Sequence, residues 1–309
     1  MFGLLNVHKP AGMTSRDVVN RIQRVVRPVK VGHAGTLDPL ATGVLIVLVG
    51  NATRLTDYAH LHDKTYVGEF RLGQWSDTED IEGNVVVEES PRIPTREELE
   101  GLLPKFVGEI SQRPPAYSAL KVGGERAYDL ARQGKAVELA PRMIEVHSIK
   151  LLKFEYPDLQ MEITCGSGTY IRSLGRDIAE AAGTCALMTS LVRTRIGPWH
   201  LQNAKRLEEL DNLTAIKESL LPAKEVVSLL ESLVATPDEI IALSHGKKIA
   251  RSFEMPLTCG TELAVLAEAA ELAAVVVVEE TNLASSDVAI AQGHVLRVVK
   301  FFPDCLVKA

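Results

Sequence analysis

The stretch GHAGTLDPLATG, residues 32–43, decides how the rest of this 309-residue sequence is interpreted. Its three glycines allow tight turns and a close approach of the backbone to a ligand. Pro39 disfavours the helical conformation for the preceding residue, so Asp38 should present its carboxylate from a stiff, extended loop. An ordinary turn in which Asp38 caps a backbone N–H has the same composition. The residues alone therefore leave a structural turn and a reactive carboxylate both open.

The segments on either side of this loop predict a helix and a buried strand. Residues 14–27 have capping-box spacing at Thr14 and Asp17, followed by an apolar stripe with arginines on the opposite face. The apolar run VLIVLVG (44–50) is short enough for a buried strand. The next segment, residues 64–73, alternates in polarity, which places four residues on one side of a strand: Tyr66, Gly68, Phe70 and Leu72.

Farther along, the pattern continues to mix helices, strands and turns. Residues 77–84 have turn composition, and residues 95–107 predict a helix with four residues inward: Leu99, Leu102, Leu103 and Phe106. The strand at 159–165 precedes a helix that runs to about Ala182, with Ile171, Leu174 and Ile178 inward and Gly183 as its C-cap. Strands alternating with single helices predict an α+β domain.

Two other segments interrupt this pattern. Residues 111–135 open with two prolines and form an excursion that carries basic and aromatic side chains: Lys121, Arg126, Arg132, Lys135, Tyr117 and Tyr128. A domain boundary is expected near residues 225–236, before a small, β-rich unit. The chain is therefore expected to hold a larger domain with an insertion and a small C-terminal domain.

Composition indicates a soluble globular protein of roughly two domains, at ~150 residues each. Hydrophobic residues make up 46% of the chain, which excludes a disordered class. The four cysteines lie far apart without a C-x-x-C pair, so reduced thiols are expected. The longest apolar tract, residues 263–278, contains two glutamates and should not span a bilayer. Because the N-terminus lacks signal-peptide features, we expect a cytoplasmic protein.

The net charge of −6 is unevenly distributed. Residues 236–309 carry six Lys and Arg against ten Asp and Glu, a net −4, whereas residues 1–36 carry six basic groups against Asp17 alone. Residues 105–135 hold six basic groups against three acidic ones. Local basic stripes decide whether phosphates are attracted, although such a stripe is often just a solvated helix face. The charge pattern therefore permits an RNA partner without requiring one.

Five motifs, in order along the chain, resemble those of the bacterial tRNA pseudouridine-55 synthase family. Residues 32–43 resemble the family's catalytic loop, GH-x-G-T-L-D-P-x-A-x-G. The other four resemble an N-terminal K-P-x-G-x-[ST]-S motif, a K-x-Y strand, an inserted element that grips the tRNA arm, and a C-terminal catalytic motif: HKPAGMTS (8–15), DKTYVGEFRLG (63–73), PPAYSALKVGGERAYDLARQG (114–134) and GTYIR (168–172).

The resemblance implies a fold. It implies an α+β, mixed-sheet pseudouridine-synthase catalytic domain over residues 1–230, with the tRNA-gripping insertion at about 111–135. It also implies a small β-rich domain over residues 236–309, of the PUA-like kind found in pseudouridine synthases and archaeosine transglycosylases. The likeness weakens after about residue 235, and the acidic charge of that part argues against strong RNA binding there.

The resemblance also implies roles for individual residues in isomerising uridine 55 of the TΨC loop. Asp38 is implied to be the catalytic aspartate, with Arg172 against it. The others are implied to surround the flipped base: Tyr66 and Tyr170 beside it, Leu191 on the wall of its pocket, and His33 near the flipped nucleotide. Of these, Tyr66 is also a catalytic candidate, because its hydroxyl can handle a proton after the new C–C bond forms.

The residue types suit this chemistry. Breaking the C1′–N1 bond, rotating the uracil and rejoining it through C5 needs a carboxylate that attacks C1′ or stabilises positive charge on the sugar. Arg172 offers the planar, two-donor geometry that lysine lacks. A base inside a folded arm must be extruded and held, and Tyr66 offers an aromatic face for this. Without the motifs, Tyr66 would equally be a core residue and Arg172 an exposed helix residue.

We expect the protein to need no cofactor and no metal, since the isomerisation is redox-neutral and no cluster of metal ligands is evident. We also expect no association with a membrane. The expected partner is tRNA, bound through its TΨC arm by a monomer. Two residues depart from the family pattern: Ala34 stands where threonine is frequent, and His8 where an aspartate is usual. Neither departure affects the aspartate, tyrosine and arginine set.

Three other functions remain open. A non-catalytic RNA-binding module would be expected to lack Asp38 or Arg172. A nucleosidase or glycosidase shares the first chemical step, but most such enzymes flank the scissile bond with two carboxylates. A guide-RNA-dependent relative acting on ribosomal RNA stays within the same enzyme class, whereas the excursion at 111–135 favours direct binding of a tRNA arm.

Overall fold

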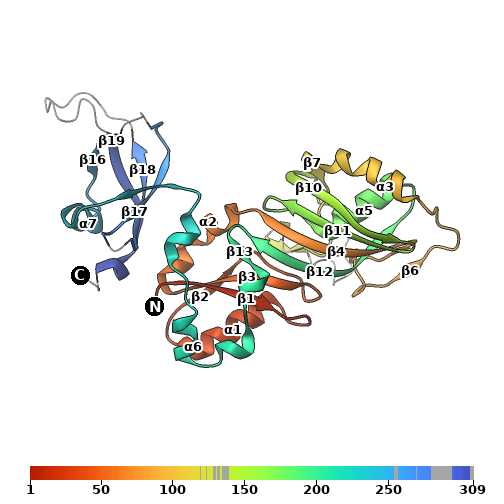
Figure 1. Cartoon of the computed structure of the whole chain (residues 1–309), viewed down its shortest axis with the longest axis horizontal. Coiled ribbons are helices and arrows are strands. Elements are labelled where there is room, and N and C mark those ends of the chain that lie inside the picture. Colours follow the sequence, from red (N-terminus) through yellow and green to blue (C-terminus); the bar gives the residue numbers. More distant parts are fainter. Residues whose placement is uncertain are drawn as a thin grey trace.

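A computed structural model describes residues 1–118, 120–122, 124–127, 130, 133, 139–253, 257–268, 270–279 and 294–306. Figure 1 shows a large curved sheet with helices packed on it, and a smaller sheet formed by the C-terminal part of the chain. None of the helices in these ranges is long and apolar enough to cross a membrane.

Ten strands form the large sheet, which we call the main sheet. In chain order they are β1 (Gly3–Lys9), β2 (Val31–Ala34), β3 (Thr42–Val49), β4 (Lys64–Leu72), β7 (Gly108–Gln112), β10 (Arg142–Glu155), β11 (Asp158–Cys165), β12 (Ala186–Ile196), β13 (Trp199–His200) and β14 (Lys205–Arg206). Their spatial order is β14-β1-β3-β12-β4-β11-β10-β7, with β2 paired to β3 and β13 to β12. The pairs β1–β14 and β3–β12 are parallel and the others antiparallel. The predicted mixed-sheet α+β fold is therefore confirmed.

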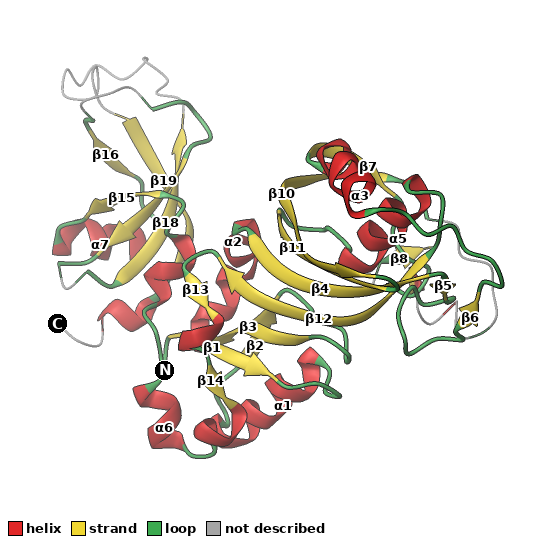
Figure 2. Cartoon of the chain, turned by 45° about the vertical axis from the view of Figure 1, so that its right-hand side comes forward, coloured by secondary structure: helices red, strands yellow, loops and turns green. Residues whose placement is uncertain are grey.

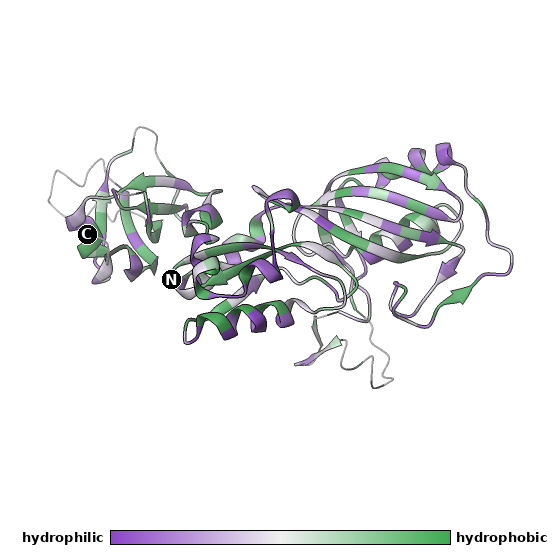
Figure 3. Cartoon of the chain, turned by 60° about the horizontal axis from the view of Figure 1, so that its bottom comes forward, coloured by the Kyte–Doolittle hydropathy of each residue, from purple (hydrophilic) through white to green (hydrophobic). Residues whose placement is uncertain are grey.

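Strand β3 lies between two hydrophobic cores, which explains why its sequence is apolar throughout. Successive side chains of a strand point to opposite faces. Three therefore enter one core and three the other: Val44, Ile46 and Leu48 on one face, and Leu45, Val47 and Val49 on the opposite face. Other strands of the main sheet differ from β3, because hydrophobic and hydrophilic residues alternate along them (Figure 3).

Helix α1 (Ser15–Val26) covers one of these cores, as its apolar stripe predicts. The predicted capping box is present: the Asp17 N–H donates to Thr14 Oγ1 at 3.1 Å, and the Thr14 N–H donates to Asp17 Oδ2 at 2.9 Å. This cap fixes the start of the helix just after the turn that follows Lys9, the last residue of β1. The arginines of the opposite face are exposed: Arg16, Arg21 and Arg24.

The third core lies between the central strands of the main sheet and helices α3 (Arg96–Leu102) and α5 (Ile171–Ala181). The alternating face of β4 enters it, and so does the predicted stripe of α5. Helix α3 is shorter than the predicted 95–107, because a 3₁₀ turn, η2 (Leu103–Phe106), replaces its last part. Pro104 causes this change, since its ring excludes an α-helical continuation.

Shorter elements connect these parts. The hairpin β5 (Gln74–Trp75) and β6 (Val86–Val87) encloses the predicted turn at 77–84 and lies at one end of the main sheet (Figure 2). The others are η1 (Gly50–Leu55), α2 (Thr56–Leu61), β8 (Lys121–Val122), β9 (Glu125–Arg126), η3 (Leu201–Asn203), η4 (Leu207–Leu210), α6 (Leu213–Glu218), η5 (Ala223–Val227) and η7 (Pro303–Leu306).

The excursion at 111–135 is described in part. It begins in β7 and contains the short hairpin of β8 and β9. Tyr128, Arg132 and Lys135 lie outside the described residues, as do the side chains of Lys121 and Arg126. The described contacts of this segment with the rest of the chain are therefore those of its first part, around Tyr117.

The C-terminal sheet has five strands: β15 (Glu231–Val234), β16 (Ile249–Arg251), β17 (Glu262–Leu266), β18 (Leu272–Glu279) and β19 (His294–Phe301). Their order is β15-β17-β18-β19-β16, and helix α7 (Pro237–Ser244) packs on them over a separate core. The long apolar tract at 263–278 supplies β17 and β18.

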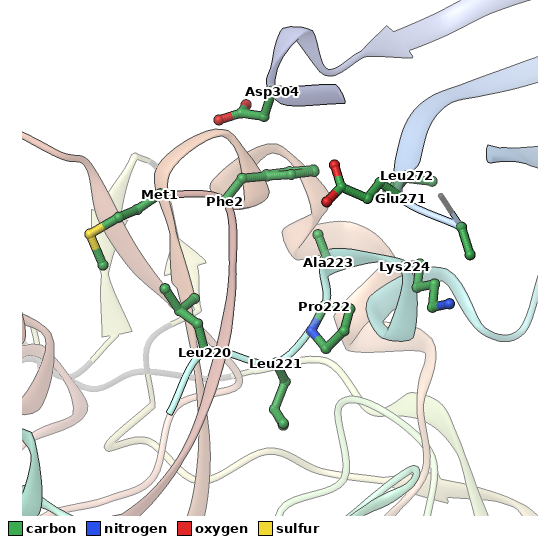
Figure 4. Close-up of a pocket in the computed structure, with 11 residues that line it drawn as sticks. Met1, Phe2, Leu220, Leu221, Pro222, Ala223, Lys224, Glu271, Leu272 and Asp304 are labelled. Carbon is green, nitrogen blue, oxygen red and sulfur yellow. The ribbon is translucent and has the colours of Figure 1, made fainter. Parts of the chain in front are cut away.

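Residues near both ends of the chain make contacts between this sheet and the part of the chain that contains the main sheet. Phe2 stacks on Phe302 at 5.1 Å between ring centroids, and Arg54 Nη1 donates to the Phe301 carbonyl at 2.8 Å. A cavity of about 550 Å³ lies beside this junction (Figure 4), lined mainly by residues near the N-terminus, the linker and the C-terminal sheet: Met1, Phe2, Leu220, Leu221, Leu272 and Asp304. The cavity contains no residue of the predicted site.

Candidate active site

The loop that carries Asp38 connects strands β2 and β3, which pair with each other. It is bounded by two glycines with positive φ, Gly35 at +89° and Gly43 at +104°, a conformation that other residues rarely adopt. Within the loop, the Ala41 N–H donates to the Asp38 carbonyl at 3.1 Å. The loop therefore has a fixed course, and 38% of the Asp38 side chain is exposed.

Arg172 lies directly against Asp38, with its Nε 3.1 Å from Asp38 Oδ2. The arginine stands in the first turn of α5 and is only 6% exposed, so it is not a surface residue. Its Nε is buried and makes no hydrogen bond of good geometry to any described residue, so the contact with Asp38 is an ion pair. The structure thus brings together the two residues that the motifs paired.

Arg172 is held from its other side by three oxygens. Its Nη1 donates to the Thr78 carbonyl at 2.5 Å and lies 3.3 Å from Asp80 Oδ2, and its Nη2 donates to the Tyr117 carbonyl at 3.2 Å. Asp80 is as deeply buried as Arg172, and its Oδ1 accepts from the Thr78 hydroxyl and the Glu82 N–H. One guanidinium therefore separates a half-exposed carboxylate from a buried one.

The turn that carries Asp80 is fixed to its surroundings by Glu79. Glu79 has a φ of +64°, unusual for a residue with a side chain, at a cost of about 1–3 kcal/mol. Its carboxylate accepts from the Ser173 hydroxyl at 2.6 Å and from Arg176, both on α5. Burial raises the pKa of Glu79, and the charge of Arg176 opposes that effect. This turn, which the sequence indicated only as a turn, is therefore part of the site.

Tyr66 and Leu191 lie in the same hydrophobic cluster as Leu37, the residue before Asp38. Tyr66 is on β4 and Leu191 on β12, and these two strands are neighbours. Burial raises the pKa of the Tyr66 hydroxyl, so it stays protonated at neutral pH. The cluster forms an apolar wall beside the exposed carboxylate.

Tyr170 precedes α5 and is positioned through its backbone. Its N–H donates to Gln112 Oε1 at 2.9 Å, and its carbonyl accepts from Gln112 Nε2 at 3.0 Å. The ring lies under the Arg142 guanidinium, 4.9 Å from its centroid, and is partly exposed. Gln112 is fully buried and so fixes the entry to the helix that carries Arg172.

His33 lies on β2, one strand residue before Ala34, and is half-buried. Burial lowers its pKa to about 4, and the nearby charge of Arg16 adds to this effect. Its Nδ1 is buried without a hydrogen-bond partner among the described residues. His33 is therefore neutral at physiological pH and has one ring nitrogen unused.

Two buried cations near the Asp38 loop were not predicted. Lys9 is fully buried, and its Nζ donates to the carbonyls of Met13, Pro10 and Pro39, at 2.6, 2.9 and 3.3 Å. Burial lowers its pKa to about 8, although the charge of Asp38 partly opposes this effect. Arg193, on β12, is equally buried. The sequence shows the charges, but nothing in its periodicity shows that they are buried.

The described residues contain no group of three or more His, Cys, Asp or Glu side chains placed to hold a metal ion. The site presents one half-exposed carboxylate, an arginine shared with a second carboxylate, and an aromatic and aliphatic wall. Such a set can hold a planar base and act on the carbon to which it is attached.

Comparison with known proteins identifies the family. Residues 23–171 match the model of the N-terminal domain of TruB family pseudouridylate synthases. The chain is 39% identical over 268 residues to tRNA pseudouridine synthase B of Rhodopirellula baltica, covering 82% of this chain and 77% of that protein. It is 43% identical over 252 residues to tRNA pseudouridine synthase B of Gluconacetobacter diazotrophicus, covering 80% and 82%.

A solved structure shares the fold over nearly the whole chain. It is that of an H/ACA RNP bound to a substrate RNA containing 2′-deoxyuridine, with a TM-score of 0.72, 25% identity, and coverage of 97% of this chain and 85% of that one. The likeness therefore extends beyond the part matched by the family model. Together with the relatives, it leads to one conclusion: the chain belongs to the TruB family of pseudouridylate synthases and is an isomerase that acts on tRNA.

Proposed function

We propose that this enzyme converts uridine 55 in the TΨC loop of tRNA to pseudouridine, with Asp38 as the catalytic carboxylate. One observation carries the proposal: Asp38 is the exposed member of the group formed by Asp38, Arg172 and Asp80. A residue that reacts with RNA must be reachable, and the two buried members form its support. The relatives named tRNA pseudouridine synthase B support the choice of tRNA.

The reaction needs no net change of charge or oxidation state. The C1′–N1 bond breaks while the Asp38 carboxylate attacks C1′ or stabilises the positive charge that develops on the sugar. The freed uracil rotates, and C5 bonds to C1′; where Asp38 has attacked C1′, the bond between them breaks in this step and the carboxylate is restored. C5 then loses its proton, and N1 gains one. Arg172 holds Asp38 in place during these steps through its ion pair.

The wall formed by Tyr66 and Leu191 is proposed to hold the flipped uracil while it rotates. An aromatic face and an aliphatic side chain grip a planar base without fixing its orientation about the ring normal, which rotation requires. Because Tyr66 keeps its proton at neutral pH, we assign it to give that proton to N1 of the freed uracil, and the phenolate so formed then accepts the proton that C5 loses. Tyr170 and the neutral His33 are proposed to contact the nucleotide from the rim.

The position of Asp80 argues against a nucleosidase or glycosidase. Those enzymes place two carboxylates on either side of the scissile bond, and one of them acts through water or as an acid. Here the second carboxylate is almost fully buried and already accepts hydrogen bonds from Thr78 and Glu82. It has no access to a sugar, which favours re-addition of the uracil over hydrolysis.

The organisation of the chain is part of the proposal. We assign residues 1–230 to the catalytic domain, with the tRNA-gripping insertion at about 111–135, and residues 236–309 to a small PUA-like domain. The start of the five-stranded sheet at Glu231 supports this boundary. We further propose that the enzyme acts as a monomer in the cytoplasm.

The test is to incubate the protein with an unmodified tRNA transcript and map pseudouridine by chemical labelling and primer extension. A single new stop at position 55, absent with an Asp38→Asn variant that still binds tRNA, is the expected result. Asp158→Asn, a surface carboxylate paired with Arg71, is the matched control and should retain full activity. Turnover by Asp38→Asn at a few per cent of the wild-type rate, or modification at another position alone, would refute the proposal.

A further inference from the structure

Arg193 is a buried cation without a carboxylate partner among the described residues. Its side chain is 1% exposed, and it lies on β12 in the centre of the main sheet. Removing a guanidinium from water is costly unless its N–H groups find acceptors. The acceptors that it has therefore indicate what the side chain does.

Two of its acceptors are backbone carbonyls at the ends of the loop that carries Asp38. Arg193 Nε donates to the Val44 carbonyl at 2.7 Å, and Nη2 donates to the Gly35 carbonyl at 3.0 Å. The guanidinium is planar and rigid, so two of its donors fix the separation of the two carbonyls. One side chain thus spans the mouth of the loop.

Two glycines allow the backbone of the Asp38 loop to lie close to Arg193. A Cβ at Gly43 would lie 2.2 Å from the Arg193 carbonyl oxygen, so only glycine permits this approach. A Cβ at Gly35 would lie 3.5 Å from Arg193 Nη1. Both glycines that bound the loop therefore face Arg193, and no other side chain separates them from it at these points.

Arg193 also contacts Tyr66. The two residues are paired across strands β12 and β4, and the Arg193 Cζ lies 5.9 Å from the centroid of the tyrosine ring. A cation at this distance from a ring face attracts it, more strongly where water is excluded. The charge of Arg193 and its hydrogen bond to the Tyr66 hydroxyl lower the pKa of Tyr66, against the larger effect of burial. One side chain is therefore in contact with both halves of the site.

We propose that Arg193 is a positioning residue of the isomerisation: it holds the two ends of the Asp38 loop at a fixed separation and aligns Tyr66 beside that loop. The inference rests on the proposed roles of Asp38 and Tyr66. Arg193 bonds to backbone carbonyls and not to a carboxylate. The loop is therefore held without a second carboxylate beside it, which would compete with Asp38 for the sugar.

Arg193→Lys is the informative variant. An ammonium keeps the charge but lacks the fork that reaches both carbonyls in one plane. A loop displaced by a fraction of an ångström should lower kcat at least about tenfold, since small errors in position have large effects on rate. The Kd for tRNA should change less than about threefold, because Arg193 does not reach the surface. Arg71→Lys, an exposed arginine on the same strand as Tyr66, should have the wild-type kcat.

Two measurements distinguish the proposed positioning role of Arg193 from a purely structural one. First, kcat is expressed per molecule that binds tRNA, so a loss of folded protein cannot imitate a loss of rate. Second, Arg193→Lys is combined with Tyr66→Phe. If Arg193 acts partly through Tyr66, the double variant should lose clearly less than the product of the two single losses. A wild-type kcat in Arg193→Lys, or strictly multiplicative losses, would overturn the inference.

Asp38→Asn is measured alongside these variants. If it turns over, the proposed function fails whatever Arg193→Lys does. If Asp38→Asn is inactive while Arg193→Lys has the wild-type kcat, only the inference about Arg193 fails.

Discussion

Asp80 and Arg172 form an almost completely buried ion pair, in which Asp80 Oδ2 lies 3.3 Å from Arg172 Nη1 and neither side chain is more than 6% exposed. Asp38 lies on the opposite side of the guanidinium and is the only one of the three that solvent reaches to a large extent. Arg172 is therefore fixed by its buried contacts before any substrate arrives. The side of the guanidinium that carries Nε then determines where the Asp38 carboxylate lies.

The Asp80→Asn variant tests that relationship. Removing Asp80 leaves the Arg172 charge with Asp38 as its one carboxylate partner among the described residues, and breaking a buried pair typically costs about 3–5 kcal/mol. We expect kcat to fall by about 100-fold or more, while the Kd for tRNA stays within a few-fold, because Asp80 is buried. Single-turnover kinetics and filter binding would measure the two quantities. A variant with normal kcat would show that Asp38 and the carbonyls of Thr78 and Tyr117 orient Arg172 without Asp80.

The Arg172→Lys variant keeps the charge but cannot donate hydrogen bonds to all the same oxygens. The guanidinium meets Asp38, Asp80 and the carbonyls of Thr78 and Tyr117 from fixed directions. A lysine ammonium reaches at most some of them, and each lost charged hydrogen bond is worth about 1.5–3 kcal/mol. We expect at least about a 100-fold loss of kcat in single-turnover assays. Near-normal rates would mean that charge alone, without this geometry, is sufficient.

The burial of Lys9 predicts a dependence of stability on pH. Its pKa in the folded protein is about 8, against 10.5 for a lysine side chain in water. Between these values the unfolded chain binds more protons than the folded one, so stability rises with pH. Below pH 8 the cost of the buried charge is fully present, and it is relieved as the pH approaches 10.5.

Lys9→Met removes this titrating group while keeping much of its volume. The difference in unfolding free energy between wild type and Lys9→Met should therefore shift in favour of wild type between pH 7 and pH 10. The expected shift is about 2–3 kcal/mol, at ~1.4 kcal/mol for each unit of pKa difference. Urea unfolding at both pH values would measure it. A difference that stays constant with pH would mean that Lys9 is more solvated than its contacts indicate.

The exposed arginines of α1 are expected to contact tRNA phosphates. An Arg21→Ala/Arg24→Ala variant should raise KM several-fold and leave kcat unchanged. Each lost contact should also reduce the slope of log affinity against log salt by ~0.7–0.9. Arg96→Ala, on the exposed face of α3 and paired with Glu100, is the control on another helix. An unchanged salt slope in the double variant would place the tRNA on a different face.

Recognition is expected to be local to one arm of tRNA. A stem-loop of ~17 nucleotides carrying the TΨC arm should be nearly as good a substrate as whole tRNA, since folded RNA loops are recognised by shape, phosphates and stacking. Replacing residues 120–134 by a short linker should raise KM. The replacement starts after Tyr117 because its carbonyl holds Arg172. An inert stem-loop, or an unchanged KM, would contradict this model of recognition.

Much of the framework follows from local sequence. The α1 capping box, the two-faced burial of β3 and the alternation of β4 depend on residues close together in the chain, so periodicity predicts them. The pairing of Asp38 with Arg172 is different, because it joins distant segments. It was expected only from the motifs, and the roles of Tyr170, His33 and Leu191 in binding the base stay predictions.

The buried charges could not be predicted by the same means. Lys9 and Arg193 bond to backbone carbonyls, which every residue has, so no partner appears in the sequence. Asp80 lies in a segment whose composition is that of an exposed turn, and its burial depends on how α5 and β12 close over it. A charge near a catalytic motif is visible in a sequence, but its solvation is a property of the whole fold.

The place of β12 in the main sheet has a consequence for biosynthesis. This strand pairs with β3 on one side and with β4 on the other, yet it is made after both. Until the ribosome has released residues 186–196, the growing chain therefore displays an unpaired edge along most of β4 and at Thr42 and Gly43 of β3, and such edges are sites of intermolecular pairing. Arg193 belongs to the same strand. Its hydrogen bonds to the two ends of the Asp38 loop can therefore form only when β12 pairs with its neighbours. A nascent chain stalled before residue 186 is accordingly expected to be both inactive and prone to aggregate.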